Sequence, residues 1–264
     1  MRKYIQITKN TWDEALIYRT SFIFYRVREL LKLFSLYFLW YFVTSQNKEF
    51  FGYDQSGIIT YLLISTFVGD FIYSTRTTAI ASEINEGILT NFLVRPFSYL
   101  KYYFARDLAD KALNIIFALG EYAIFFSLLR PPFIFQTNLA SLVIFMVSVL
   151  LGVVLYYFIS VLISLIGFWS NEGWGPRFIF YQTIGFISGS LFPLDVLPRS
   201  VFVILELLPF PYLIFFQSKI YQGQLSGFEI IKGFVILIVW ICIMYYITML
   251  VWKKGLRTYT AQGR

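Results

Sequence analysis

Long apolar stretches separated by short polar clusters run through most of this chain. A helix needs about 20 mostly apolar residues to cross the roughly 30 Å hydrocarbon core of a bilayer. The pattern therefore predicts an all-α membrane protein with six transmembrane helices, near residues 22–45, 58–74, 112–129, 139–169, 178–191 and 234–252. The first begins before the lipid because it carries charges up to Lys32, and the fourth must tilt, bend near Gly152 or project from the bilayer.

The first 20 residues predict a helix that lies in the membrane interface. Its apolar side recurs at helical spacing and charged residues occupy the remaining positions. The residues on that side are Ile5, Thr8, Trp12, Ala15 and Leu16.

Residues 193–221 are largely apolar, but prolines divide them into pieces too short to span a bilayer. Irregular backbone at membrane depth is tolerated only where neighbouring helices cover it. We therefore expect an outer re-entrant hairpin of two short helices before the last span. Its candidate gate residues are Pro193, Pro198, Glu206, Pro209 and Pro211.

Composition agrees with a membrane protein, because 58% of residues are hydrophobic and only 14% are charged, whereas soluble domains carry about 25% charged residues. The net charge of +7 comes from basic residues that flank apolar segments, so they indicate topology and lipid phosphate contacts rather than nucleic acid. With the N-terminus inside, 17 of the 22 lysines and arginines face the cytoplasm. This predicts a multi-pass protein of one domain (residues 1–264) with both ends cytoplasmic, and a cytoplasmic loop at 75–111.

The chain offers few groups for chemistry. It has no histidine and one cysteine, Cys242, so we expect no metal site, no catalytic residues and no cofactor on this chain. A rhomboid-like serine protease is disfavoured for the same reason, although Ser188 and Ser190 lie beside glycines. No phosphate-binding loop G-x-x-x-x-G-K-[ST] occurs, so the chain does not hydrolyse ATP itself.

The loop at 75–111 contains an amphipathic pattern that predicts one helix over residues 83–96. Ile84, Ile88 and Phe92 recur at i, i+4 and i+8 on one side, and Arg95-Pro96 marks its end. The pattern fits a helix that lies on the membrane, and it equally fits one that docks into another protein.

Two ionisable residues lie within predicted spans, Asp70 and Glu121. Such residues usually face the bundle interior or water, so both are candidates for a translocation path. The alternative for Asp70 is an ion pair with nearby Arg76. In the fifth predicted helix, Gly185 and Gly189 form a G-x-x-x-G pattern that favours close helix packing, within the chain or between two such chains.

Three segments carry a resemblance to a known family: EINEGILTNFLVRPFSYL at 83–100, SGSLFPLDVLPRSVFVILELLPFPY at 188–212 and WKKGLRTYTAQGR at 252–264. With the overall layout, they make the chain similar to the ABC type-2 exporter permeases of about 260 residues that pair with a separately encoded ATPase. The resemblance implies two permeases, identical or related, with two ABC ATPase subunits that bind ATP and Mg²⁺, in the inner (plasma) membrane. It also implies that residues 193–216 cap the path on the outer side.

In this family the segment matching 83–96 is a coupling helix that fits a groove on the ATPase. Carried over by position, the interface candidates are Glu83, Glu86, Gly87, Arg95 and Pro96, beside the apolar stripe named above. The competing hypothesis is an ion-coupled secondary transporter or channel that uses Asp70 and Glu121. The sequence does not identify the substrate, although an apolar, aromatic path suits a hydrophobic or amphipathic one.

Overall fold

A computed structural model of the chain describes residues 2–46 and 51–260, and this part is helical and contains no β-strand. The long helices are α1 (Arg2–Ile17), α2 (Arg19–Gln46), α3 (Gln55–Tyr73), α6 (Tyr99–Leu129), α7 (Leu139–Ser164), α8 (Trp174–Ile187) and α11 (Gly227–Thr258). The short α-helices are α4 (Ala79–Asn85), α5 (Leu89–Leu93), α9 (Arg199–Glu206) and α10 (Phe215–Tyr221). Three 3₁₀ turns complete the described part: η1 (Leu165–Phe168), η2 (Leu194–Val196) and η3 (Phe210–Tyr212).

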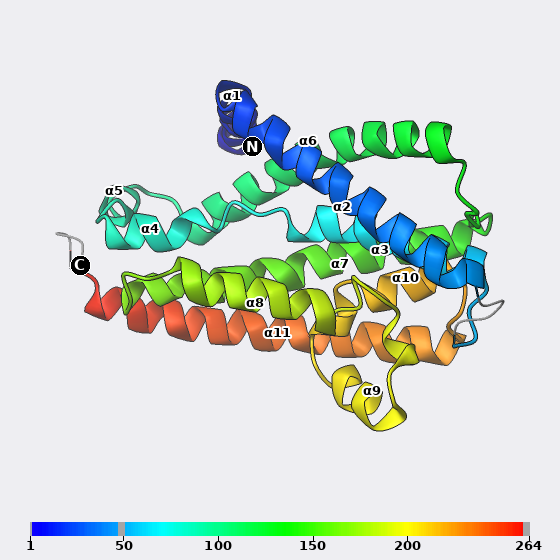
Figure 1. Cartoon of the computed structure of the whole chain (residues 1–264). Coiled ribbons are helices and arrows are strands. Elements are labelled where there is room, and N and C mark those ends of the chain that lie inside the picture. The colour runs from blue at the N-terminus through cyan, green and yellow to red at the C-terminus, as the bar shows by residue number, and fades with distance from the viewer. Residues whose placement is uncertain (1, 47–50, 261–264) are drawn as a thin grey trace.

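The long helices run roughly side by side and define two ends of the bundle (Figure 1). Helix α1, the short helices α4 and α5 and the end of α11 lie toward one end, here called the α4 end. The connections from α6 to α7 and from α10 to α11 lie at the other, here called the α10 end. The first helix and the end of the last helix of the described part therefore lie toward the same end of the bundle.

Local side-chain caps explain where several helices start. The Asp54 carboxylate accepts a hydrogen bond from the Gly57 amide at 3.0 Å and begins α3. Asn138 accepts from the amides of the first turn of α7. Ser226 and Glu229 form a reciprocal capping box at the start of α11. At the other end of α6, Arg130 adopts a left-handed conformation before the two prolines, which confirms that the helix ends there.

Within residues 2–46 and 51–260, four helices are long and apolar enough to cross a membrane: α3, α6, α7 continued through η1, and α11. They contain four of the predicted spans, although α6 begins at Tyr99, well before residue 112. The predicted first span corresponds to α2, whose first half carries five charged side chains. The predicted fifth corresponds to α8, whose 14 residues extend only about 21 Å at 1.5 Å per residue. The six-span count is therefore not confirmed by length and hydropathy alone.

Helix α3 is the centre of the bundle. Of its most apolar 18-residue window 78% is buried, against 11% for α11, so α11 presents mostly side chains suited to lipid. Helix α3 packs against α2, α6, α7 and α10. Gly152 of α7 allows one of these contacts, because a Cβ there would lie 2.9 Å from Ile72 Cδ1. Gly152 therefore permits close packing, and α7 continues past it as regular helix.

The segment at 193–221 consists of four short helical pieces, η2, α9, η3 and α10, rather than a simple hairpin of two helices. Prolines precede or enter three of these pieces, where the missing amide proton costs little. Every residue of α10 is buried against α3 and α7. By contrast, Val201 and Ile204 of α9 and Leu207, which follows this helix, are exposed.

Candidate functional site

The predicted single helix at 83–96 is wrong in one respect, because the chain breaks it at Glu86 and Gly87. Gly87 has φ +75°, a conformation open to glycine but costly for other residues, so α4 ends before it and α5 begins after it. The predicted stripe is consequently divided. Ile84 is buried, whereas Ile88 is 37% exposed and Leu89 is fully buried in its place.

Contacts with α6 and α11 hold the two short helices at the end of the bundle. The Tyr99 hydroxyl donates to Glu83 Oε2 at 2.6 Å, and the Thr90 amide donates to the Tyr259 hydroxyl at 3.2 Å. Phe92 packs edge-on against Tyr99 with 5.2 Å between ring centroids. Glu86, Leu93, Val94, Arg95 and Pro96 are exposed around this anchored core. The exposed residues form a surface on a rigid support, which is what a protein-binding site requires.

A cavity of about 880 Å³ opens next to α4. Its deep wall contains buried residues such as Asp70 and Tyr156. Exposed lining residues lie next to α4 (Ser82, Glu172 and Trp174) and also along α2 and α8 (Ser21, Arg28, Phe178 and Tyr181), so the opening extends from the α4 end along these two helices. Tyrosines and charged groups of both signs line it: Tyr18, Tyr25, Tyr73, Tyr156, Tyr181, Glu14, Glu29, Asp70, Asp110, Glu172, Arg28, Arg76 and Arg177. A mixed polar and aromatic wall suits an amphipathic molecule better than a purely apolar one.

Asp70 lies in the wall of this cavity, but its predicted ion pair with Arg76 is wrong. The Lys32 ammonium of α2 lies 3.4 Å from Asp70 Oδ1 and 3.4 Å from Glu29 Oε2. Arg76 lies beyond the end of α3 and reaches α1 and α6 instead. Sequence reasoning missed Glu29 because the charges at the start of α2 were expected to lie before the lipid, whereas Glu29 is only 4% exposed.

Glu121 does not line the cavity. Its carboxylate binds the Arg26 guanidinium of α2 through two hydrogen bonds, Nε to Oε1 at 2.7 Å and Nη2 to Oε2 at 2.5 Å. The structure therefore places the two intramembrane carboxylates in different environments, one at a cavity and one in a helix contact.

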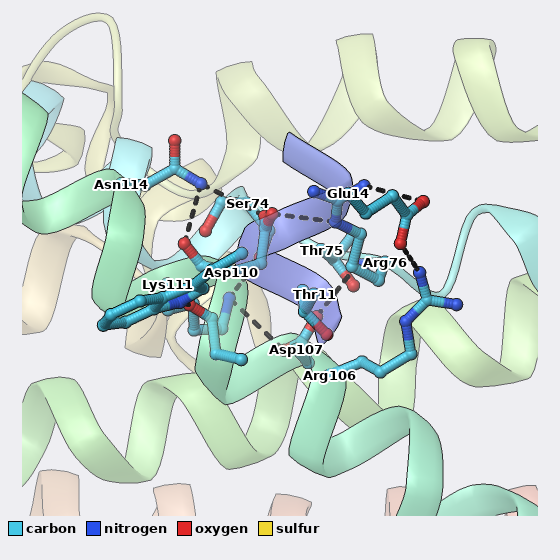
Figure 2. A network of polar contacts seen from close by, with 12 residues as sticks. Thr11, Glu14, Ser74, Thr75, Arg76, Arg106, Asp107, Asp110, Lys111 and Asn114 are labelled. Atoms are coloured by element: carbon cyan, nitrogen blue, oxygen red, sulfur yellow. Dashed lines mark hydrogen bonds and ion pairs between the residues drawn. The ribbon is translucent and has the colours of Figure 1, made fainter. Parts of the chain in front are cut away.

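A polar network surrounds the connection between α3 and α4 (Figure 2). Arg76 Nε donates to Asp110 Oδ1 at 2.8 Å, and Arg76 Nη1 lies 3.7 Å from Glu14 Oε1 of α1. Arg106 of α6 pairs with the other oxygen of Glu14. The Trp12 indole of α1 donates to the Ala109 carbonyl at 2.7 Å. Helix α1 therefore packs on α6 through specific polar contacts, beyond the interfacial role that the sequence predicts.

An all-helical bundle with a cavity beside an anchored, partly exposed pair of short helices agrees with the resemblance seen in the sequence. The family model described as ABC-2 family transporter protein matches residues 30–263. This chain belongs to the ABC-2 transporter family. No match was found among curated protein sequences.

Membership identifies the chain as the membrane component, or permease, of an ABC transporter, a class that in general works with ABC ATPase subunits. The family match begins inside α2 and leaves out α1, which packs on α6. Helix α1 of this ABC-2 permease therefore lies outside the family match, and its contacts with α6 are known only from the structure.

At the α10 end, the permease contains a polar cluster that sequence reasoning missed. Lys219 of α10, only 8% exposed, donates to the Tyr53 hydroxyl and to Asp195 Oδ2, both at 2.7 Å. Tyr53 in turn donates to Asp195 at 2.9 Å. Burial, and secondly the Asp195 carboxylate, raises the pKa of the Tyr53 hydroxyl, which therefore stays protonated. The signal available in the sequence was a lysine near the end of the largely apolar segment 193–221.

The proposed gate residues lie in different settings. Pro193, Pro209 and Pro211 are buried, whereas Pro198 is exposed at the start of α9. Glu206 lies 3.6 Å from Lys232 of α11. Ion pairs therefore connect residues 193–206 to α10 and α11. That these residues act as an outer gate stays a prediction.

The predicted small-residue face in the fifth helix is wrong. Gly185 belongs to α8, but Gly189 lies beyond the end of α8 with φ +81°. Gly189 instead makes a turn whose carbonyl accepts a 2.6 Å hydrogen bond from Tyr61. A Cβ at Gly189 would lie 2.7 Å from the Tyr61 hydroxyl oxygen, so glycine is required for both backbone and space.

Proposed function

We propose that this chain is the transmembrane permease subunit of an ATP-driven exporter whose ATPase is a separate polypeptide. Two permeases, identical or related, and two ATPase subunits form the working unit in the plasma membrane. Helices α2 and α8 complete six spans beside the four most apolar helices, with both chain ends cytoplasmic. The substrate is a hydrophobic or amphipathic molecule that occupies the cavity beside α4.

The observation that carries the proposal is the position of α4 and α5. They are anchored on α6 and α11, expose Glu86, Arg95 and Pro96, and lie next to the cavity opening. A partner bound to this surface would touch the permease where a small displacement changes the opening. Because the chain belongs to the ABC-2 family, we expect this partner to be an ABC ATPase.

Co-purification tests the partnership. The tagged permease, purified from the cells to which it is native, is expected to co-purify with an ABC ATPase, and Glu86→Arg is expected to weaken the complex by reversing an exposed charge. Glu206→Arg, at the opposite end, is the matched control. Undiminished binding of the Glu86 variant would remove Glu86 from the interface, and failure of the parent protein to bind would contradict the proposal.

A second measurement separates ATP-driven export from ion coupling through Asp70. Inverted vesicles that contain the complex are expected to accumulate a fluorescent amphipathic dye, rhodamine 6G, with ATP and to continue when an ionophore collapses the ion gradients. Uptake that needs the gradient and not ATP would favour the ion-coupled alternative.

A further inference from the structure

Helix α4 forms part of the cavity opening. Ala81, Ser82 and Asn85 line the cavity, and Asn171 lines it from the connection between η1 and α8. The two sides touch where the Asn85 amide donates to the Asn171 carbonyl at 3.3 Å. Because α4 supplies one side of this contact, a movement of α4 changes the width of the opening.

The preceding end of α3 is firmly fixed. Lys111 of α6 is 1% exposed and donates to the carbonyls of Phe71 at 3.1 Å, Ile72 at 2.8 Å and also Ser74. These carbonyls belong to the last turn of α3 and the residue after it, where a positive charge is favoured. Lys111 therefore connects the end of α3 to α6, and only residues 75–78 separate this point from α4.

Within that short connection, Arg76 bonds to two other helices. Its amide donates to Asp107 Oδ1 at 3.2 Å and its Nε donates to Asp110 Oδ1 at 2.8 Å, both on α6. Its Nη1 faces Glu14 of α1 (Figure 2). The guanidinium fork is suited to bridge two carboxylates at once, which a lysine ammonium does less well.

The next residue bonds to the opposite side of the cavity. The Thr77 hydroxyl lies 2.6 Å from the Ser160 hydroxyl of α7 and accepts from Arg177 Nη2 of α8 at 3.4 Å. Arg177 also donates to Ser160 at 2.9 Å. Residues 76 and 77 thus join α4 to four helices that contribute to the cavity wall, α1, α6, α7 and α8.

We infer that Arg76 is a positioning residue that transmits movement of α4 to α1 and α6 and thereby sets the width of the cavity opening. The inference rests on the proposed function, because the ATPase supplies the movement of α4. Arg76 need not touch substrate for this role. Its contribution is to make α4, α1 and α6 move as one unit, since a buried or half-buried charge pair resists separation of its partners.

Crosslinking across the opening tests this without knowledge of the substrate. The parent carries Asn85→Cys and Asn171→Cys in a Cys242→Ser background, in the complete complex with its ATPase in lipid vesicles. The rate of crosslinking by a short bis-maleimide is measured without nucleotide and with MgADP-vanadate. We expect nucleotide trapping to change the rate about fivefold, the lower end of ordinary coupling between sites.

Arg76→Gln is expected to abolish this nucleotide response while the complex still assembles and hydrolyses ATP. Arg76→Lys, which retains the charge, is expected to restore part of the response. Arg106→Gln is the matched control, because Arg106 pairs with the same Glu14 but lies within α6 and not next to α4.

A full response in Arg76→Gln, or an equal loss in Arg106→Gln, would overturn the inference and leave the proposed function intact. No response in an assembled parent complex would overturn both. If Arg76→Gln does not assemble, Arg76→Lys serves as the test variant, and an undiminished response to nucleotide in it contradicts the need for the two-carboxylate bridge.

Discussion

Arg26 of α2 binds both carboxylate oxygens of Glu121 of α6, at 2.7 Å through Nε and 2.5 Å through Nη2. The Arg26 side chain is 7% exposed and that of Glu121 is 16% exposed. Asn114 lies on the same side of α6 and accepts from Arg26 Nη1 at 3.4 Å. Because of this bidentate pair, the buried Arg26 charge of α2 has a carboxylate partner inside the bundle.

Glu121→Gln is expected to destabilise the permease, because it leaves the Arg26 charge without its carboxylate. Loss of one partner of a buried pair costs about 3–5 kcal/mol, and the partial exposure of Glu121 places the expected effect at the lower end. Thermal unfolding in detergent measures it. Glu206→Gln, which breaks a more exposed pair with Lys232, is the control and should cost at most about 1 kcal/mol. Equal melting temperatures for the two variants would contradict this ranking.

Lys32→Met is expected to destabilise the bundle because it removes the cation that faces both Asp70 and Glu29. Adding Asp70→Asn removes one of the two carboxylates and should recover part of the loss. Residues in direct contact typically show interaction energies of about 0.5–3 kcal/mol in such double-mutant cycles. Strictly additive effects on the unfolding temperature would mean that Lys32 and Asp70 do not interact.

Gly87→Ala is expected to weaken ATPase binding, because it strains the backbone turn between α4 and α5 and so disturbs how the two helices are held. A residue with a Cβ pays about 1–2 kcal/mol in the left-handed conformation that Gly87 adopts at φ +75°. Gly223→Ala carries the same kind of strain at φ +67° beside α10, so it controls for loss of stability alone. Co-purification reduced equally by both variants would argue against a specific role of this turn.

Lys219→Met is expected to loosen the α10 end, since Asp195 and Tyr53 both lose their contact with the ammonium group. Tyr53→Phe removes one hydroxyl and leaves the Lys219–Asp195 ion pair, so its effect should be smaller. Protease cleavage of residues 193–226 in intact vesicles provides the measurement. Greater cleavage of the Tyr53 variant than of the Lys219 variant would reverse the proposed order of contributions.

Much of the fold was predictable from sequence where a property belongs to one segment alone. The spans at α7 and α11 follow from their uninterrupted apolar length, and the end of α6 follows from Pro131 and Pro132. Each of these depends on transfer of a segment into lipid or on a local backbone restriction. The amphipathic segment that forms α4 and α5 was located by its pattern, but the break at Gly87 was missed because helical spacing continues through it.

The partners of the charged residues could not be predicted in the same way. Asp70 and Arg76 are close in sequence, yet α3 ends between them and their side chains reach different helices. The pair Gly185 and Gly189 has the spacing of a helix face, but α8 ends before Gly189. In both cases spacing along the chain was a poor guide because a helix terminus lies within the pattern.

The sequence by itself determined that this is a helical membrane protein, because hydropathy is a property that each segment carries with it, and its similarity to the ABC-2 family over residues 30–263 determined the family. Only the tertiary structure decided that Arg26 binds Glu121, that Lys32 lies between Asp70 and Glu29, and that Arg76 joins α4 to α1 and α6. The physical reason is that an ion pair depends on how two helices cross, and the crossing follows from the packing of every apolar side chain between them.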